Sequence, residues 1–145
     1  MAQSAQNFEN HGQIIPLYHG FVFFTFVANF LWAGWQLIQS PGVGTAIGLV
    51  MAVALIVFFF YARVFALKVQ DRVIRLEMRM RLKELLPADL QQHVQALTVD
   101  QLVALRFASD AELPSLVAQV VKDGVNDRKA IKRMVKDWQG DYLRA

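Results

Sequence analysis

The sequence contains no cysteine, and neither lysine nor arginine occurs before Arg63. Without cysteine, disulfide bonds, thiolate metal sites and thiol catalysis are excluded. All 15 basic residues lie at or after Arg63, whereas the chain before it carries one formal charge, on Glu9. This uneven charge divides the chain into an uncharged part suited to lipid and a basic part suited to water.

Two long apolar stretches fill the uncharged part. Residues 17–38 and 43–62 contain no charged side chain, and each reaches the length of about 20 residues that a helix needs to cross a bilayer. Between them, residues 39–42 (QSPG) contain proline and glycine, which end a helix and favour a tight reversal. The sequence predicts an all-α protein with a transmembrane helical hairpin (residues 17–62) after an N-terminal tail (residues 1–16).

The flanking residues predict how the hairpin is oriented. Tyr18 and Trp35 are spaced along the first helix to match the two surfaces of one bilayer, where such rings are enriched. Basic residues crowd the chain just after the second span and are absent from the loop between the spans. Both termini are therefore expected in the cytoplasm. A buried helix pair in a soluble protein is the alternative, and two consecutive uncharged stretches with aromatic ends disfavour it.

Small and polar residues within the spans are candidates for helix packing. Gly44, Gly48 and Ala52 repeat at four-residue spacing, which allows another helix to approach closely. Asn29 is the deepest amide of the first span, and its burial in lipid is costly unless it finds a hydrogen-bond partner. Both features fit packing within the hairpin as well as contact with another chain. A channel subunit is a weaker interpretation, because the spans lack the ionisable residues of a conduction path.

Histidines near the membrane surface raise the question of a cofactor. His19 is a candidate axial ligand for haem or for a pigment metal, and Glu9 and His11 precede it. Their spacing matches no metal motif, so the leading interpretation includes no cofactor. A cofactor- or pigment-carrying subunit of a redox or light-harvesting membrane complex is retained as the alternative function.

The second span is predicted to continue as a helical stalk, residues 63–86. This stretch contains neither glycine nor proline, and Pro87 disfavours a helical conformation at the residue before it. Apolar residues recur along the stalk at coiled-coil-like spacings of four, three and four: Val69, Val73, Leu76 and Met80. We expect this apolar stripe either to pack on the later helices or to pair with another copy of the chain.

A basic stripe runs along the same helix. It comprises Lys68, Arg72, Arg75, Arg79 and Lys83. A solvated helix face explains it, and attraction to anionic lipid or to an acidic partner surface is the functional alternative. Asp71 with Arg75, and Glu77 with Arg81, also have the spacing of i,i+4 ion pairs.

Residues 87–145 are predicted to form a small cytoplasmic head of short amphipathic helices. The first of these helices is expected over residues 87–97. Further boundaries are marked by Thr98 with Gln101 and Ser109 with Glu112 as capping boxes, by Gly124 as a stop, and by Asn126 as the cap of the last helix. That helix is expected to continue to Gly140 and to carry Trp138 on its apolar face as a candidate partner surface.

No motif of a catalytic site occurs in the sequence. It lacks a glycine-rich phosphate loop, an HExxH motif and an EF-hand loop. His93, Ser109 and Asp110 do not make a triad, since a triad is defined by geometry. Aspartates interrupt the basic residues near the C-terminus, and no aromatic platform accompanies them. We therefore predict no enzymatic activity, no nucleic-acid binding and no small-molecule substrate.

Several stretches of the chain are distinctive: QNFENH and PLYH before the first span, LRFASDAELPSL in the head, and AIKRMVKDWQGDYLRA at the end. Together they resemble a family of bacterial two-span membrane proteins whose function is unknown. The resemblance implies a multi-pass protein of a bacterial inner membrane. It implies no activity and no catalytic residue.

These features favour a non-enzymatic integral membrane protein whose hairpin presents a helical head to the cytoplasm. Such a protein is expected to act as an accessory subunit or as a self-assembling scaffold. Its contacts would be the lipid bilayer and either a protein partner or further copies of the same chain.

Overall fold

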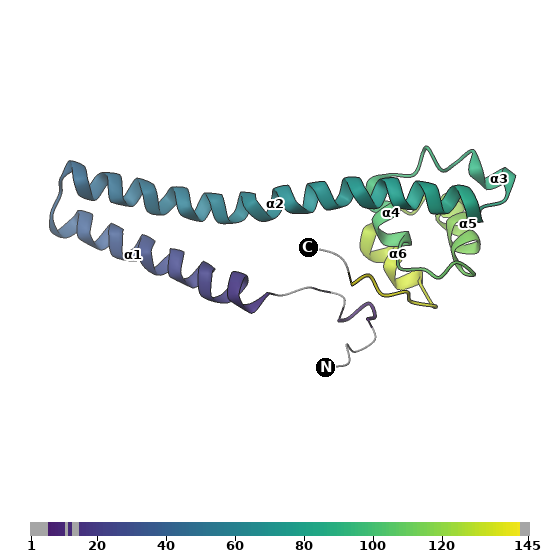
Figure 1. Cartoon of the computed structure of the whole chain (residues 1–145), viewed down its shortest axis with the longest axis horizontal. Coiled ribbons are helices and arrows are strands. Elements are labelled where there is room, and N and C mark those ends of the chain that lie inside the picture. Colours follow the sequence, from purple (N-terminus) through teal and green to yellow (C-terminus); the bar gives the residue numbers. More distant parts are fainter. Residues whose placement is uncertain (1–5, 11, 13–14, 143–145) are drawn as a thin grey trace. The chain divides into compact units, whose positions relative to one another are not determined.

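The computed structural model describes residues 6–10, 12 and 15–142 of the chain. Its helices in chain order are η1 (Pro16–Val22, a π-helix), α1 (Phe23–Gln39), α2 (Val43–Leu85), α3 (Ala88–Gln91), α4 (Val99–Leu105), α5 (Leu113–Asp123) and α6 (Arg128–Met134) (Figure 1). Within these ranges no strand occurs, and an isolated β-bridge joins Ala108 to Trp138. The predicted all-α fold class is confirmed.

The chain forms two compact units, and α2 contributes to both. Residues 13–67 make up the first, which we call the hairpin unit. Residues 1–12 and 68–145 together make up the second, which we call the head unit. The N-terminal segment is thus part of the head unit and not of the hairpin that follows it.

The hairpin unit contains η1, α1 and the first part of α2. In this unit α1 and α2 run side by side in opposite directions (Figure 1). As the sequence predicts, the reversal lies between the end of α1 and the start of α2. Aromatic contacts gather on Phe59, whose ring stacks on Tyr18 at 4.4 Å and lies 5.6 Å from Phe23. The Tyr18 hydroxyl also donates a hydrogen bond to the Phe59 carbonyl oxygen at 2.5 Å.

The helices over Pro16–Gln39 and Val43–Leu85 are long and apolar enough to cross a membrane, judged by length and composition. Only 6% and 11% of their most apolar windows are buried within the chain. The core helix of a soluble protein would bury most of such a window. An apolar surface this large requires lipid or another protein around it.

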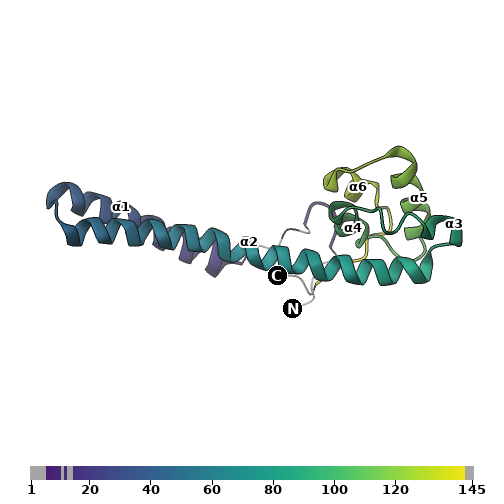
Figure 2. The same cartoon turned by 90° about the horizontal axis from the view of Figure 1, so that it is seen from above.

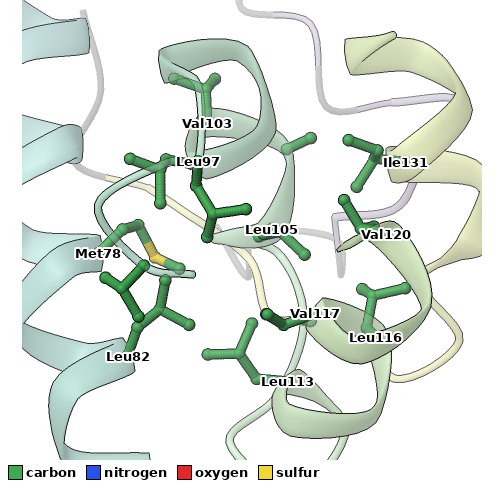
Figure 3. Close-up of a cluster of buried hydrophobic side chains, with 14 of the residues drawn as sticks. Met78, Leu82, Leu97, Val103, Leu105, Leu113, Leu116, Val117, Val120 and Ile131 are labelled. Carbon is green, nitrogen blue, oxygen red and sulfur yellow. The ribbon is translucent and has the colours of Figure 1, made fainter. Parts of the chain in front are cut away.

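The head unit is built on the last part of α2. Met78 and Leu82 project from one face of this helix into a core shared with α4, α5 and α6 (Figure 3). Ile74 belongs to the same core. In both overall views, α4, α5 and α6 lie to one side of α2 (Figures 1 and 2). Leu82, Leu105, Leu113 and Val117 are completely buried. The stalk is therefore an integral part of the head, because its inner face supplies one wall of the hydrophobic core.

The helix caps confirm part of the prediction. The Thr98 side chain accepts from the Gln101 amide, and the Gln101 side chain accepts from the Thr98 amide, so the capping box of α4 forms. Gly124 ends α5 in the left-handed conformation with φ of 60°. The Ser109 hydroxyl accepts from the Glu112 amide at 3.3 Å, although α5 itself begins at Leu113.

Three boundaries in the head differ from those predicted. The helix expected over residues 87–97 is only the single turn α3, Ala88–Gln91. The cap of α6 is Asp127, whose carboxylate accepts from the Ala130 amide, and not Asn126. Asn126 instead accepts a hydrogen bond from the Gln101 side chain. This tertiary contact draws the amide away from the helix end.

The last helix is much shorter than predicted. It ends at Met134, and Val135 has an extended backbone. The expectation that Trp138 lies on a helix is therefore wrong. The amides of Lys136 and Asp137 donate to the Glu112 carboxylate at 2.8–3.2 Å, and the Gln139 amide donates to the Phe107 carbonyl at 2.7 Å. These tertiary bonds replace the helical ones beyond Met134.

We predict that Gln101→Ala destabilises α4 and the loop before α6. The Gln101 side chain is 7% exposed and donates to the Val125 carbonyl and the Asn126 side chain. Its truncation removes these hydrogen bonds and the capping bond to the Thr98 amide, and costs about 1–3 kcal/mol in total. Hydrogen exchange of the detergent-solubilised chain measures this as faster exchange in residues 98–105. Gln95→Ala is the matched control, since that exposed side chain makes no hydrogen bond within the described ranges, and equal effects of the two variants would contradict the prediction.

Candidate functional site

The apolar stripe of the stalk faces away from the core of the head. Its four residues are between 49% and 64% exposed: Val69, Val73, Leu76 and Met80. Of the two alternatives that the sequence leaves for this stripe, packing on the later helices does not occur, because Ile74, Met78 and Leu82 occupy that position. The last part of α2 thus has two apolar faces, one buried in the head and one uncovered.

The basic stripe lies beside the uncovered apolar stripe. Arg72, Arg75 and Arg79, together with Leu76, line a shallow hollow of about 230 Å³. Arg79 also donates to the Gln95 carbonyl at 3.3 Å, which ties α2 to the segment after α3. The remaining members of the stripe, Lys68 and Lys83, are exposed. Three guanidinium groups around one leucine form a surface suited to a carboxylate or phosphate.

Arg81 connects three segments of the head. Its guanidinium donates to the Asp110 carboxylate at 2.7 Å, to the Ala108 carbonyl at 2.7 Å and to the Gln139 side chain at 3.0 Å. Sequence spacing pairs Arg81 with Glu77, but the bond formed is with Asp110. The guanidinium gains these three acceptors in this position, and all of them lie on the two segments that it anchors to α2.

The partner of Asp71 also differs from Arg75, the residue that the sequence spacing indicates. Asp71 pairs with Arg128 at the start of α6, at 3.3 Å, and Arg128 also binds Asp100 on α4. Partial burial acts to lower the pKa of Arg128, but the hydrogen bond with Asp100 and the charges of Asp71 and Asp100 raise that pKa above its ordinary value. These contacts fix α4 and α6 to the stalk.

An aromatic stack holds the C-terminal segment. The fully buried Phe107 ring lies 4.6 Å from the Trp138 ring, with an angle of 17° between the planes. The Arg106 guanidinium lies 4.5 Å from the centre of the Phe107 ring and pairs with Asp141 at 3.1 Å. Trp138, a predicted partner surface, is therefore half-buried within the head and contributes to its packing.

The N-terminal segment joins this C-terminal assembly. The Gln6 side chain donates to the Asp141 carbonyl at 3.1 Å and accepts from the Asp141 amide at 3.0 Å. The Arg133 guanidinium lies 5.3 Å from the centre of the Phe8 ring. Residues from both ends of the chain thus form one structure, a contact that no local sequence pattern predicts.

A cleft of about 330 Å³ lies between α2 and the C-terminal segment. Its polar wall includes Glu77, Arg81 and Arg106, and its apolar wall includes Val73 and Ile74. Both arginines are engaged by aspartates, as described above, whereas Glu77 has no ion pair within the described ranges. The cleft is large enough for a side chain or a small ligand. Among these three charged side chains, the Glu77 carboxylate is the one without an ion pair to a described residue.

The candidate packing residues of the spans lie on different faces of the hairpin. Ala52 is fully buried within the hairpin unit. Gly44 and Gly48 are exposed, and nothing within the described chain lies within 4 Å of the position that a Cβ atom would take at either residue. Asn29 is exposed, and its amide has no hydrogen-bond partner among the described residues. Thr25, one turn earlier, satisfies its hydroxyl by donating to the Phe21 carbonyl at 2.7 Å.

His19, the candidate cofactor ligand, lies in η1. Its Nδ1 is 3.1 Å from the Ile15 amide nitrogen and 3.2 Å from the Ile15 carbonyl oxygen. The ring also packs edge-on against Tyr18, with centroids 5.2 Å apart. His11 lies outside the described residues. Among those that are described, no three His, Cys, Asp or Glu side chains gather closely enough to hold a metal ion.

The fold and these surfaces define a helical protein with two candidate membrane spans and a compact head built on the second of them. Over residues 1–145 the chain matches the model of a family of unknown function, DUF6526, and it belongs to that family. No curated protein and no solved structure matches the chain. The resemblance of the chain to a family of unknown function is confirmed.

We predict that Glu112→Gln loosens the C-terminal segment from α5. The Glu112 carboxylate accepts from the amides of Lys136 and Asp137, and charged acceptors form stronger hydrogen bonds than neutral ones. Loss of the charge should cost about 1 kcal/mol and speed exchange of these two amides several-fold. Asp123→Asn is the control, because that exposed carboxylate has no ion pair within the described ranges. Unchanged protection in Glu112→Gln would contradict the assignment.

Proposed function

We propose that the protein is a non-enzymatic subunit of the bacterial inner membrane, anchored by its hairpin, that presents the head unit to the cytoplasm and assembles with other chains. The two apolar helices with their exposed side chains support the anchoring. The charged groups of the head support a structural role, because Arg81, Arg106 and Arg128 each hold segments of the head together.

The topology we propose places both termini in the cytoplasm. All basic residues follow the second span, whereas the loop between the spans has none. The two hydrogen bonds between Gln6 and Asp141 support the same arrangement, because two segments that bind one another lie on the same side of a membrane. An N-terminal segment on the opposite side would be unable to form them.

The observation that carries the assembly role is the uncovered polar and apolar surface of the two long helices. Asn29 lies in the first span with an exposed amide, and such an amide in lipid favours a hydrogen bond to another helix. The uncovered stripe of the stalk adds apolar surface outside the span. An accessory subunit or a self-assembling scaffold would cover both surfaces with protein.

We expect single-cysteine variants to report the proposed topology. The chain has no native cysteine, so Ser40→Cys in the loop between the spans and Gln119→Cys on the exposed face of α5 each give one reactive thiol. A membrane-impermeant maleimide added to spheroplasts should label Cys at position 40 alone. Lysed cells should label both. Labelling of position 119 in intact spheroplasts, or recovery of the chain in the supernatant after ultracentrifugation without detergent, would contradict the proposal.

We expect Asn29→Leu to weaken assembly. Purified in mild detergent, the wild-type chain should give a native mass above that of one chain, from further copies or a bound protein. An interhelical amide hydrogen bond contributes about 0.6–2 kcal/mol, so its loss should lower the association constant roughly 3- to 30-fold. Thr25→Val is the matched control, since Thr25 satisfies its hydroxyl within its own helix. A wild-type particle that is strictly monomeric, with no bound protein, would overturn the assembly role.

A further inference from the structure

The uncovered face of the stalk carries a heptad pattern with charges on both flanks. Val69 and Leu76 take the d positions, and Val73 and Met80 take the a positions. The neighbouring g positions are Arg72 and Arg79, and the e positions that follow are Glu77 and Glu84. The apolar stripe is therefore bordered by arginine on one side and by glutamate on the other.

This arrangement has the charge pattern of a parallel helix pair. In a parallel coiled coil, a g residue faces the e residue five positions later in the partner helix, and these pairs set orientation and partner choice. Arg72 would face Glu77, and Arg79 would face Glu84, once in each direction across the pair. An antiparallel pair would place arginine against arginine and glutamate against glutamate. The charges thus select a second copy of the same helix in parallel orientation.

The surface beside the stripe fits these pairs on both flanks. On the g side, Arg72, Arg75 and Arg79 line the hollow of about 230 Å³ around Leu76, which can accept a carboxylate. On the e side, Val73 and Glu77 line the cleft of about 330 Å³, which leaves room for a guanidinium beside the Glu77 carboxylate. Arg72, Glu77 and Glu84 are exposed and form no ion pair within the described part of the chain.

We propose that the stalks of two copies of this chain pair in parallel through Val69, Val73, Leu76 and Met80, with reciprocal ion pairs between Arg72 and Glu77 and between Arg79 and Glu84. Valine at an a position with leucine at the following d position favours two strands. The proposal rests on the proposed membrane anchoring, because copies inserted with one orientation bring α2, an uninterrupted helix, into parallel alignment. The buried face of α2 remains in the head, so pairing requires no rearrangement of its core.

Disulfide crosslinking in native membranes tests the pairing. Two d residues face one another only in a parallel pair, so oxidation of Leu76→Cys should give a covalent dimer of the full-length chain. Arg75→Cys is the matched control at the neighbouring c position, which lies outside the a and d positions that meet across the pair, and should stay monomeric. Efficient crosslinking at both positions, or at neither while the chain remains in the membrane fraction, would overturn the proposal. Loss of the chain from the membrane fraction would instead overturn the anchoring on which it rests.

Charge reversal then tests the partner. In the Leu76→Cys background, Arg72→Glu and Glu77→Arg should each lower crosslinking about tenfold, because each variant turns two attractive pairs into repulsive ones. Co-expression of the two variants under different tags should restore crosslinking between them, since every pair in the mixed dimer is again attractive. This rescue also shows that neither variant is misfolded.

The same experiment separates the other candidates for the stalk surface. Anionic lipid or an unrelated acidic partner would respond to loss of Arg72 and not to reversal of Glu77, and the mixture would give no rescue. Either result would overturn the proposed pairing. Restored crosslinking in the mixture, together with its loss in both single variants, supports it.

Discussion

The contact between α2 and the short helices of the head is the constraint on which the rest of the structure depends. Outside α2, the longest helix of the head unit is α5, with 11 residues. Helices this short gain little stability from their own hydrogen bonds and depend on tertiary packing. Ile74, Met78 and Leu82 supply that packing along more than two turns of a long helix. The stalk is therefore also the base on which the head folds.

Polar contacts fix what the hydrophobic core brings together. Arg81 holds the turn before α5 and the C-terminal segment against α2, and Arg128 holds α6 against α2 and α4. The distinctive LRFASDAELPSL stretch supplies several of these contacts, through Phe107, Asp110 and Glu112. Packing of the head thus accounts for these three residues of the stretch.

Local signals in the sequence located the features that depend on neighbouring residues. The apolar stretches, the turn between them, the Thr98 capping box and the Gly124 stop all involve groups within a few positions of one another. The cap of α6 and the end of that helix were missed because their determinants lie elsewhere in the chain. Gln101 binds Asn126 from α4, and Glu112 binds the backbone beyond Met134 from the start of α5.

The sequence by itself determined that two helices are apolar enough for a membrane and that the chain continues as an uninterrupted helix to Leu85. The reason is that hydropathy and the absence of glycine or proline act locally. Only the tertiary structure decided which apolar face of the stalk enters the head. Ile74, Met78 and Leu82 recur at helical spacing as regularly as Val69, Val73 and Leu76, so periodicity favours neither. The short helices cover the first set because their own apolar faces meet α2 on that side, together with Asp110 and Arg128, which pair with Arg81 and Asp71 of α2.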